Sequence, residues 1–92
     1  MNFQQRVKIA PDVMVRAFNN EAILLNLKTE TYFELDEVGA SMWQHVTSAQ
    51  AIQAAYEALL EEYDVEPAQL KADMIDLLTR LLDHGLIVLA DE

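Results

Sequence analysis

The sequence predicts an α+β fold, in which a three-stranded antiparallel meander precedes three helices. Two changes of pattern indicate this order. Apolar residues alternate with a period of two between residues 13 and 35, and recur with a period of about 3.6 after residue 36. The chain has 92 residues, of which 52% are hydrophobic and only two are Gly and two Pro, so it can build one modest core without long linkers. We therefore expect residues 1–92 to form a single domain.

Short polar turns separate the three predicted strands. The first strand covers Val13–Phe18 and the second covers residues 21–27, with Asn19-Asn20 between them. Asn tolerates positive φ, so this pair predicts a tight hairpin turn. A second polar turn at residues 28–30 leads to the third strand, Thr31–Leu35. A simple meander leaves the first and third strands as the two edges of the sheet.

The third strand has an unpaired outer edge, because no later strand of the meander follows it. Such an edge is either protected against aggregation or used as a template for an extended ligand. Glu30 and Glu34 are compatible with protection, so periodicity alone leaves both interpretations open. Alternation places Phe33 and Leu35 on one face of the strand. Tyr32 and Glu34 then share the other face, where an aromatic side chain stands beside a charge.

Two helices are predicted to follow the third strand. Asp36 is a good N-cap for a first helix over about residues 37–46, in which Gly39 permits close approach to the sheet. The segment Thr47-Ser48-Ala49-Gln50 has the form of a capping box, with Gln three residues after Thr. This segment predicts that a second helix starts there and continues to about Tyr63.

The third helix is the longest predicted element. Pro67 suits the first helical position, and Gly85 ends the helix just after His84. The apolar residues of this helix span an arc of roughly 160°, wider than contact with a small sheet requires. Asp76 and Arg80 are spaced for an i,i+4 ion pair along the border of that arc. Part of the helix surface is therefore predicted to be free for a ligand.

The two ends of the chain carry weaker signals. Residues 1–11 show no clear period, and we predict a lead-in segment that lies over the sheet. Leu86-Ile87-Val88-Leu89 is predicted to be a short apolar tail that packs on the core.

The balance of charge disfavours one large class of partner. The formal net charge is −10, from 16 acidic residues against six scattered Lys and Arg, so we expect no binding to nucleic acid. The acidity either serves solubility or attracts a basic peptide or enzyme surface.

The chain has no Cys and no apolar run of about 18 residues, so we expect a soluble, cytoplasmic protein without a membrane partner.

Residue patterns that carry catalysis are missing. His45 and His84 fall on different predicted helices, and neither has a second ligand at the spacing of a metal site. Ser41 and Ser48 lack a nucleophile elbow, and two Gly cannot form a phosphate-binding loop. The many carboxylates are typical of solvated helix faces. We therefore predict a protein that is not an enzyme and that uses no metal or other cofactor.

Three strands followed by three helices is a winged-helix-like arrangement, and several segments resemble one family. The run from Leu35 to Gly39, followed by Trp43, resembles that family's Leu-(Asn/Asp)-x-x-Gly-x-x-x-(Ile/Val/Met)-Trp pattern. Met42 and Trp43 stand one residue closer to Gly39 than in the pattern. Further signature positions are Glu62-Tyr63-Asp64-Val65, Asp73 with Leu77-Leu78, and Leu81-Leu82-Asp83-His84-Gly85-Leu86. Over about residues 12–89 the chain is similar to the PqqD-like family, also called the RiPP recognition element, for ribosomally made and post-translationally modified peptides.

The resemblance implies a non-catalytic protein that binds the leader of a precursor peptide. In the family, the leader adds as an extra strand to the third strand, in the groove beside the third helix. Carried over to this chain, the backbone of Thr31–Leu35 supplies the ladder, with Tyr32 and Glu34 as side chains at the groove. The residues implied to bind peptide are Thr31, Tyr32, Phe33, Glu34, Leu35, Asp73, Asp76, Leu77, Arg80 and Leu81.

The resemblance also implies a partner enzyme. A lasso-type pathway, with a leader peptidase or another modifying enzyme as partner, is favoured over pyrroloquinoline quinone biosynthesis, in which the partner is a radical SAM enzyme. Two other classes stay open, a winged-helix regulator that grips DNA and a structural adaptor that steadies an enzyme through its acidic face. The regulator needs a basic recognition helix, whereas the predicted second helix has no Lys or Arg. We expect a monomer or a weak dimer.

Overall fold

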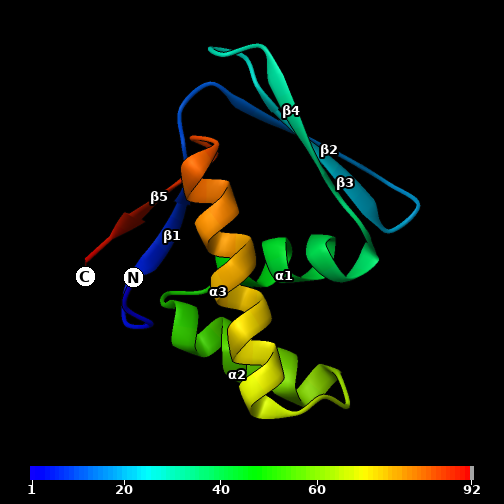
Figure 1. Ribbon diagram of the computed structural model, residues 1–92, viewed down its shortest axis with the longest axis vertical. Coiled ribbons are helices and arrows are strands. Elements are labelled where there is room, and N and C mark those ends of the chain that lie inside the picture. The colour runs from blue at the N-terminus through cyan, green and yellow to red at the C-terminus, as the bar shows by residue number, and fades with distance from the viewer. Residues whose placement is uncertain (92) are drawn as a thin grey trace.

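The computed structural model describes residues 1–91 and shows the three predicted strands and three predicted helices in the predicted order, with one further strand near each end of the chain (Figure 1). The strands are β1 (Arg6–Ile9), β2 (Val13–Phe18), β3 (Glu21–Asn26), β4 (Thr31–Leu35) and β5 (Ile87–Ala90). The helices are α1 (Glu37–Ser48), α2 (Ile52–Glu62) and α3 (Pro67–Asp83). The predicted α+β fold is confirmed, and β2 and β4 have the predicted bounds.

Strands β2, β3 and β4 form an antiparallel sheet in that order. Asn19 and Asn20 have φ values of 49° and 65° at the first turn, which confirms the predicted hairpin. Leu24 in the middle strand is fully buried and lies opposite Val15 on β2 and Phe33 on β4. Directly opposite residues share a face of a sheet, so this row belongs to the face that packs on the core.

The two ends of the chain form a second sheet, which the sequence did not predict. β1 pairs with β5 in antiparallel register, with Val7 opposite Leu89. Val7 and Ile87 are both 2% exposed, so both strands contribute to the core. The predicted tail does pack on the core, but as a strand, and the lead-in pairs with it instead of lying over the main sheet. Each strand has only four residues, too few to establish a period, and its partner lies at the other end of the chain.

The predicted capping box at residues 47–50 is wrong. Helix α1 continues to Ser48, and the Thr47 hydroxyl donates a 2.7 Å hydrogen bond to the Trp43 carbonyl instead of capping a new helix. Helix α2 begins at Ile52, and no side chain caps its N-terminus.

Backbone from the start of the chain caps α2. The carbonyl oxygens of Gln5 and Phe3 accept hydrogen bonds from the backbone N–H groups of Ile52 and Gln53, at 2.9 and 2.8 Å. The first N–H groups of a helix have no partner within the helix and require one from outside. A remote segment supplies those acceptors here, so the local sequence around residue 50 could not indicate where α2 begins.

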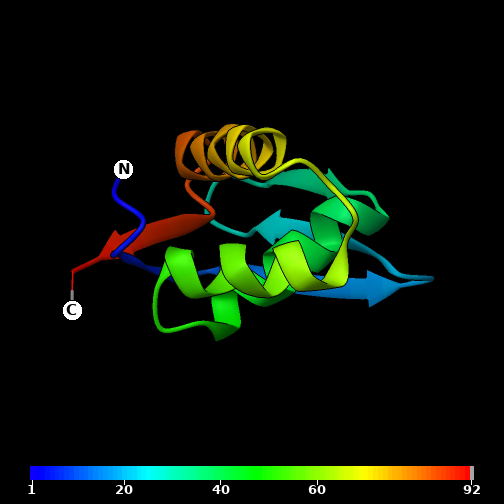
Figure 2. The same ribbon diagram turned by 90° about the horizontal axis from the view of Figure 1, so that it is seen from below.

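Helix α3 runs along the long axis of the molecule on one of its faces (Figure 2). In the view of Figure 1, the β2-β3-β4 sheet lies to one side of α3 and the β1-β5 sheet to the other. The observed bounds of α3 confirm Pro67 as its start and Gly85 as the residue that follows its end. The core draws on the helices and on both sheets. Its largest fully buried side chains are Leu24, Ile52, Leu59, Met74, Leu78, Leu81, Leu86, Ile87, Val7 and Val46.

A buried side-chain amide fixes the end of α3 beside the turn between β3 and β4. Asn26 is 6% exposed, and its Nδ2 donates to the carbonyl oxygens of His84 and Gly85 at 3.2 and 3.4 Å. Its Oδ1 accepts from the backbone N–H groups of Lys28 and Thr29 at 3.0 and 3.2 Å. Gly85 adopts a φ of 68°, the left-handed conformation common after a helix C-terminus. These bonds set the position of α3 relative to β4.

Candidate functional site

A groove of about 450 Å³ lies between β4 and α3, and we call it the β4 groove. Its apolar lining comes from Phe33 and Leu35 on β4 and from Leu77 on α3. The rest of the lining consists of Glu21, Glu34, Asp36, Gly39 and Arg80. The β4 groove therefore combines apolar contact area with charges of both signs.

The outer edge of β4 is open along this groove. Within residues 1–91, β4 pairs with β3 alone and is the last strand of its sheet. In an antiparallel sheet, alternate residues of an edge strand point their N–H and C=O groups outward. Figure 1 places both ends of the chain on the far side of α3 from β4, so the β1-β5 sheet does not cover this edge. The strand thus offers one half of a main-chain ladder.

One face of α3 forms the helical wall of the β4 groove. Leu77 is half-buried there, whereas Leu81, one turn later, is 0% exposed in the core. Arg80 also lines the groove, and its Nε lies 3.3 Å from Asp76 Oδ2, which confirms the predicted i,i+4 pair. Both side chains are well exposed, so this pair adds little to stability and serves to orient the guanidinium group.

A ring contact holds the aromatic side chain of the groove in place. The rings of Phe33 and His84 meet edge to face, with centroids 5.2 Å apart and an interplanar angle of 73°. His84 Nδ1 lies 2.8 Å from the carbonyl oxygen of Arg80, and because a carbonyl only accepts, Nδ1 carries the hydrogen. The imidazole is therefore fixed at the C-terminal end of α3, where it positions Phe33.

The structure brings half of the predicted peptide-binding residues together. The five that line the β4 groove are Phe33, Glu34, Leu35, Leu77 and Arg80. Asp73 and Asp76 are exposed on α3 outside the lining, and Leu81 is enclosed in the core. Leu81 therefore has no surface to offer to a ligand, because the side of α3 that carries it packs inward.

Thr31 and Tyr32 lie on β4 but outside the lining of the groove. The Tyr32 side chain is 63% exposed. Phe33 lies opposite the buried Leu24 and thus faces the core, so alternation along the strand turns Tyr32 to the other face of the sheet. Tyr32 can contact a ligand only around the strand edge.

Three residues that line the β4 groove were not among the predicted peptide-binding residues. Glu21 is the first residue of β3 and lies beside the end of β4. The antiparallel register of β3 and β4, which pairs Ala22 with Leu35, could have predicted this position. Asp36 is confirmed as the N-cap of α1, because its Oδ1 accepts from the Gly39 N–H at 2.8 Å. A Cβ on Gly39 would lie 3.3 Å from both Asp36 Oδ1 and Leu35 Cδ2, which confirms that glycine permits a close approach there.

The chemistry of the β4 groove suits recognition of an extended chain. It offers main-chain donors and acceptors, an apolar surface, and both carboxylate and guanidinium groups. Across residues 1–91, the structure has no group of three or more His, Asp or Glu that could hold a metal ion. In the same part of the chain, no helix is long and apolar enough to cross a membrane.

Comparison with solved structures shows two similar chains, each with a TM-score of 0.81. One, described as "TbiB1 in Complex with the TbiA(beta) Leader Peptide", is 31% identical and covers 87% of this chain and 93% of its own. The other, described as "Lasso peptide synthetase B1 complexed with the leader peptide", shares the fold at 22% identity and covers 90% of this chain and 98% of its own. A search of curated proteins found no match.

Comparison with protein families shows a match over most of the chain. Residues 21–87 match the family described as coenzyme PQQ synthesis protein D (PqqD). The matched range begins at β3 and extends through β4 and the three helices to the start of β5, so it includes the whole β4 groove. The resemblance found in the sequence is confirmed, and the chain belongs to the PqqD family.

Proposed function

We propose that the protein binds the leader of a ribosomally made precursor peptide as an additional strand on β4, and presents it to an enzyme of a lasso-type pathway. The observation that carries this proposal is the open edge of β4 beside an apolar groove. The likeness to a solved protein that holds a leader peptide supports it. In this role the protein contributes recognition, and the partner enzyme contributes the chemistry.

The energetics of strand addition require the groove as well as the edge. Ordering a leader segment as long as β4, which has five residues, costs about 5–10 kcal/mol at roughly 1–2 kcal/mol per residue. Main-chain hydrogen bonds contribute only about 1 kcal/mol each after exchange with water. Burial of apolar leader side chains must therefore supply most of the remainder.

The lining of the β4 groove indicates which leaders it selects. Alternate side chains of an added strand point to the same face as Phe33 and Leu35, toward Leu77 on α3. An aromatic or branched aliphatic leader residue fits that apolar surface. Arg80 favours a leader carboxylate nearby, and Glu34 favours a basic residue at the strand edge.

The partner in this proposal is a leader peptidase or another modifying enzyme, and the protein acts as a monomer or a weak dimer. A second candidate is a role in pyrroloquinoline quinone biosynthesis with a radical SAM enzyme, which the description of the matching family favours. Binding to a lasso-type leader but not to a quinone-pathway precursor would distinguish the two. Recognition of DNA is disfavoured, because α2 contains no Lys or Arg.

A titration of isotopically labelled protein with the leader peptide tests the proposal by NMR. We expect changes in the backbone amide signals of Thr31–Leu35 and of residues 73–81, because these segments border the β4 groove. Changes confined to Val13–Phe18 would contradict this placement, because β2 is the other edge of the sheet.

N-methylated leaders separate main-chain pairing from side-chain contact. Methylation of every second leader amide removes the donors that face β4 without changing the side chains, and we expect about a tenfold or greater loss of affinity. Methylation of the intervening amides is the matched control, because those donors point away from the strand. Equal losses in the two peptides would argue against strand addition.

A further inference from the structure

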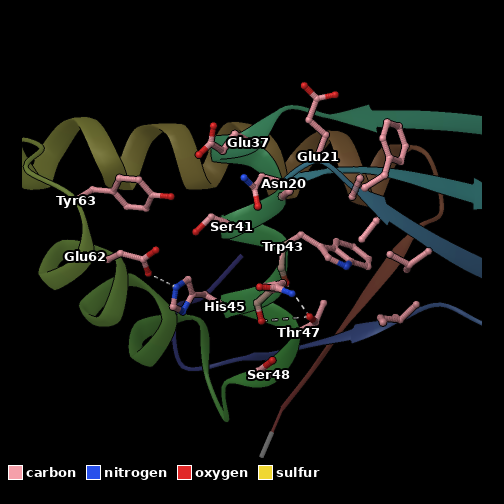
Figure 3. Close-up of a pocket in the computed structure, with 17 residues that line it drawn as sticks. Asn20, Glu21, Glu37, Ser41, Trp43, His45, Thr47, Ser48, Glu62 and Tyr63 are labelled. Atoms are coloured by element: carbon pink, nitrogen blue, oxygen red, sulfur yellow. Dashed lines mark hydrogen bonds and ion pairs between the residues drawn. The ribbon is translucent and has the colours of Figure 1, made fainter.

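The opposite edge of the main sheet borders a second and larger groove. This β2 groove has a volume of about 1030 Å³ and is lined by β2, the β2–β3 turn, α1 and the end of α2 (Figure 3). Strand β2 pairs with β3 alone among the strands of residues 1–91, and β1 pairs with β5 instead. The β2 groove therefore also combines a free strand edge with a helical wall.

Apolar side chains are left uncovered along this groove. Ile9, Val15 and Phe18 line it and are 44%, 37% and 48% exposed. Trp43 also lines the groove but is itself buried, so it is a rigid aromatic part of the wall. Several exposed apolar residues gathered in one concave site are typical of an interaction surface, in contrast to apolar residues scattered singly.

Acidic side chains dominate the charge of the β2 groove. Its lining includes the carboxylates of Glu21, Glu37 and Glu62 but no Lys or Arg (Figure 3). The β4 groove, in contrast, has Arg80 in its lining. With a net charge of −10 on the whole chain, the field at the β2 groove attracts a basic segment and repels an acidic one.

One of these carboxylates is held in place by a hydrogen bond between two helices. Glu62 Oε2 at the end of α2 lies 2.7 Å from His45 Nε2 on α1, as the dashed line in Figure 3 shows. The Glu62 side chain is 49% exposed, so it still faces solvent at the border of the groove. This bond joins the two helices of the wall and fixes the direction of the charge.

We propose that the β2 groove docks a basic, extended segment of the enzyme that processes the bound precursor, an inference that rests on the proposed function. The segment adds to the β2 edge, places an apolar side chain against the exposed Val15 and Phe18, and directs Lys or Arg toward Glu37 and Glu62. A second copy of this chain is the less suitable occupant, because two molecules of charge −10 repel each other. A leader on β4 leaves the β2 edge free.

Simultaneous occupation brings enzyme and leader close together. With one added strand on each side, the order becomes enzyme segment, β2, β3, β4 and leader. The two added strands are then four spacings of about 4.8 Å apart, or roughly 19 Å. Cleavage or modification just beyond the bound leader segment is within reach of an enzyme anchored at that distance.

A pair of substitutions at one exposed position tests the proposal. Ala17 lies on β2 and lines the groove, so Ala17→Arg adds both bulk and positive charge, whereas Ala17→Glu adds bulk with negative charge. We expect Ala17→Arg to weaken association with the pathway's leader peptidase about tenfold or more, and Ala17→Glu to change it less than about threefold. Isothermal titration calorimetry measures both with the leader-bound protein, and circular dichroism checks that each variant is folded.

A second pair of variants controls for general loss of acidity. Glu62→Gln removes a negative charge at the β2 groove but keeps a side chain that can form hydrogen bonds. Glu57→Gln removes a negative charge from an exposed position of α2 that does not line the groove. Only Glu62→Gln is expected to weaken association, by about threefold to tenfold. Equal effects of both, or equal effects of the two Ala17 variants, would overturn a charge-selective site.

Leader affinity, measured for the same variants, separates this inference from the proposed function. Unchanged leader affinity with lost enzyme association supports the β2 groove as the docking site. Intact enzyme association in Ala17→Arg overturns the inference and leaves leader binding at β4 standing. A dimer seen by sedimentation that Ala17→Arg dissociates would overturn it in favour of a second copy. Failure of the unmodified protein to bind leader would refute the proposed function instead, while enzyme docking can still be measured without leader.

Discussion

The two edges of one sheet present the same main-chain groups but different side-chain surroundings. The β4 edge faces α3 across a groove of about 450 Å³ that contains Arg80, and the β2 edge faces α1 and α2 across one of about 1030 Å³ that has carboxylates but no Lys or Arg. A ladder of N–H and C=O groups pairs with almost any extended chain. The flanking helix therefore decides which chain each edge accepts, and four experiments test this difference.

The largest expected effect comes from a charge placed in the β4 groove. Leu77→Arg removes apolar contact area and puts a desolvated cation beneath the leader, so we expect about a 100-fold loss of leader affinity, or roughly 2.7 kcal/mol. Ile75→Arg is the matched control, because Ile75 is exposed on the same helix outside the lining. Fluorescence anisotropy with labelled leader measures both. Similar losses in the two variants would mean that the leader does not use this groove.

A change at Asn26 is expected to act on one edge more than on the other. Asn26→Asp keeps an acceptor for the turn but removes the donor to the carbonyls of His84 and Gly85, so unfolding in urea should become easier by about 2 kcal/mol. Because these bonds position α3, leader affinity should fall, whereas enzyme docking at the β2 groove should persist in the folded protein. Loss of enzyme docking without loss of leader binding would contradict this assignment.

Removal of a helix cap has a smaller effect on the β4 side. Asp36→Ala leaves the Gly39 N–H without its 2.8 Å acceptor, and we expect the free energy of unfolding to fall by about 1 kcal/mol. Thermal unfolding followed by circular dichroism measures the change. Glu37→Ala, one position later and inside the helix, should cost less, because Asp36 is the residue that caps α1. A larger loss for Glu37→Ala than for Asp36→Ala would show that the cap is not the source of the effect.

A change in salt concentration is expected to have the smallest effect on leader affinity at the β4 groove. It should also give the clearest difference between leader binding there and enzyme association at the β2 groove. Between about 50 and about 500 mM NaCl, leader binding should change less than about threefold, because apolar burial and main-chain pairing carry it. Enzyme association through the acidic β2 groove should weaken steadily over the same range, since exposed charges are screened. Equal salt dependence of the two equilibria would remove the proposed distinction.

Much of the fold could be predicted because it is encoded locally. The meander, its Asn19-Asn20 turn and the bounds of β2 and β4 followed from alternation and from residues that tolerate positive φ. Pro67 and Gly85 marked the ends of α3 for equally local reasons. The open edge of β4 followed as well, since a meander must end at an outer strand.

The residues of the site were predicted only in part. Alternation correctly separated Phe33 and Leu35 from Tyr32, but it could not tell which face meets α3. The apolar arc of α3 likewise included both Leu77 and Leu81, of which one lines the groove and the other is enclosed in the core. The periodicity of apolar residues in the sequence shows that one face of a helix is apolar. Only the packing of the folded chain decides whether that face is covered by the protein itself or is free for a ligand.

The sequence by itself determined the order and extent of most elements, because turns, caps and periods depend on neighbours within a few residues. The tertiary structure alone decided the contacts between distant segments. The pairing of β1 with β5, the capping of α2 by carbonyls from Phe3 and Gln5, and the acidic surroundings of the β2 edge all belong to this class. Backbone groups are chemically alike along the chain, so which remote donor meets which acceptor is fixed only when the core closes around them.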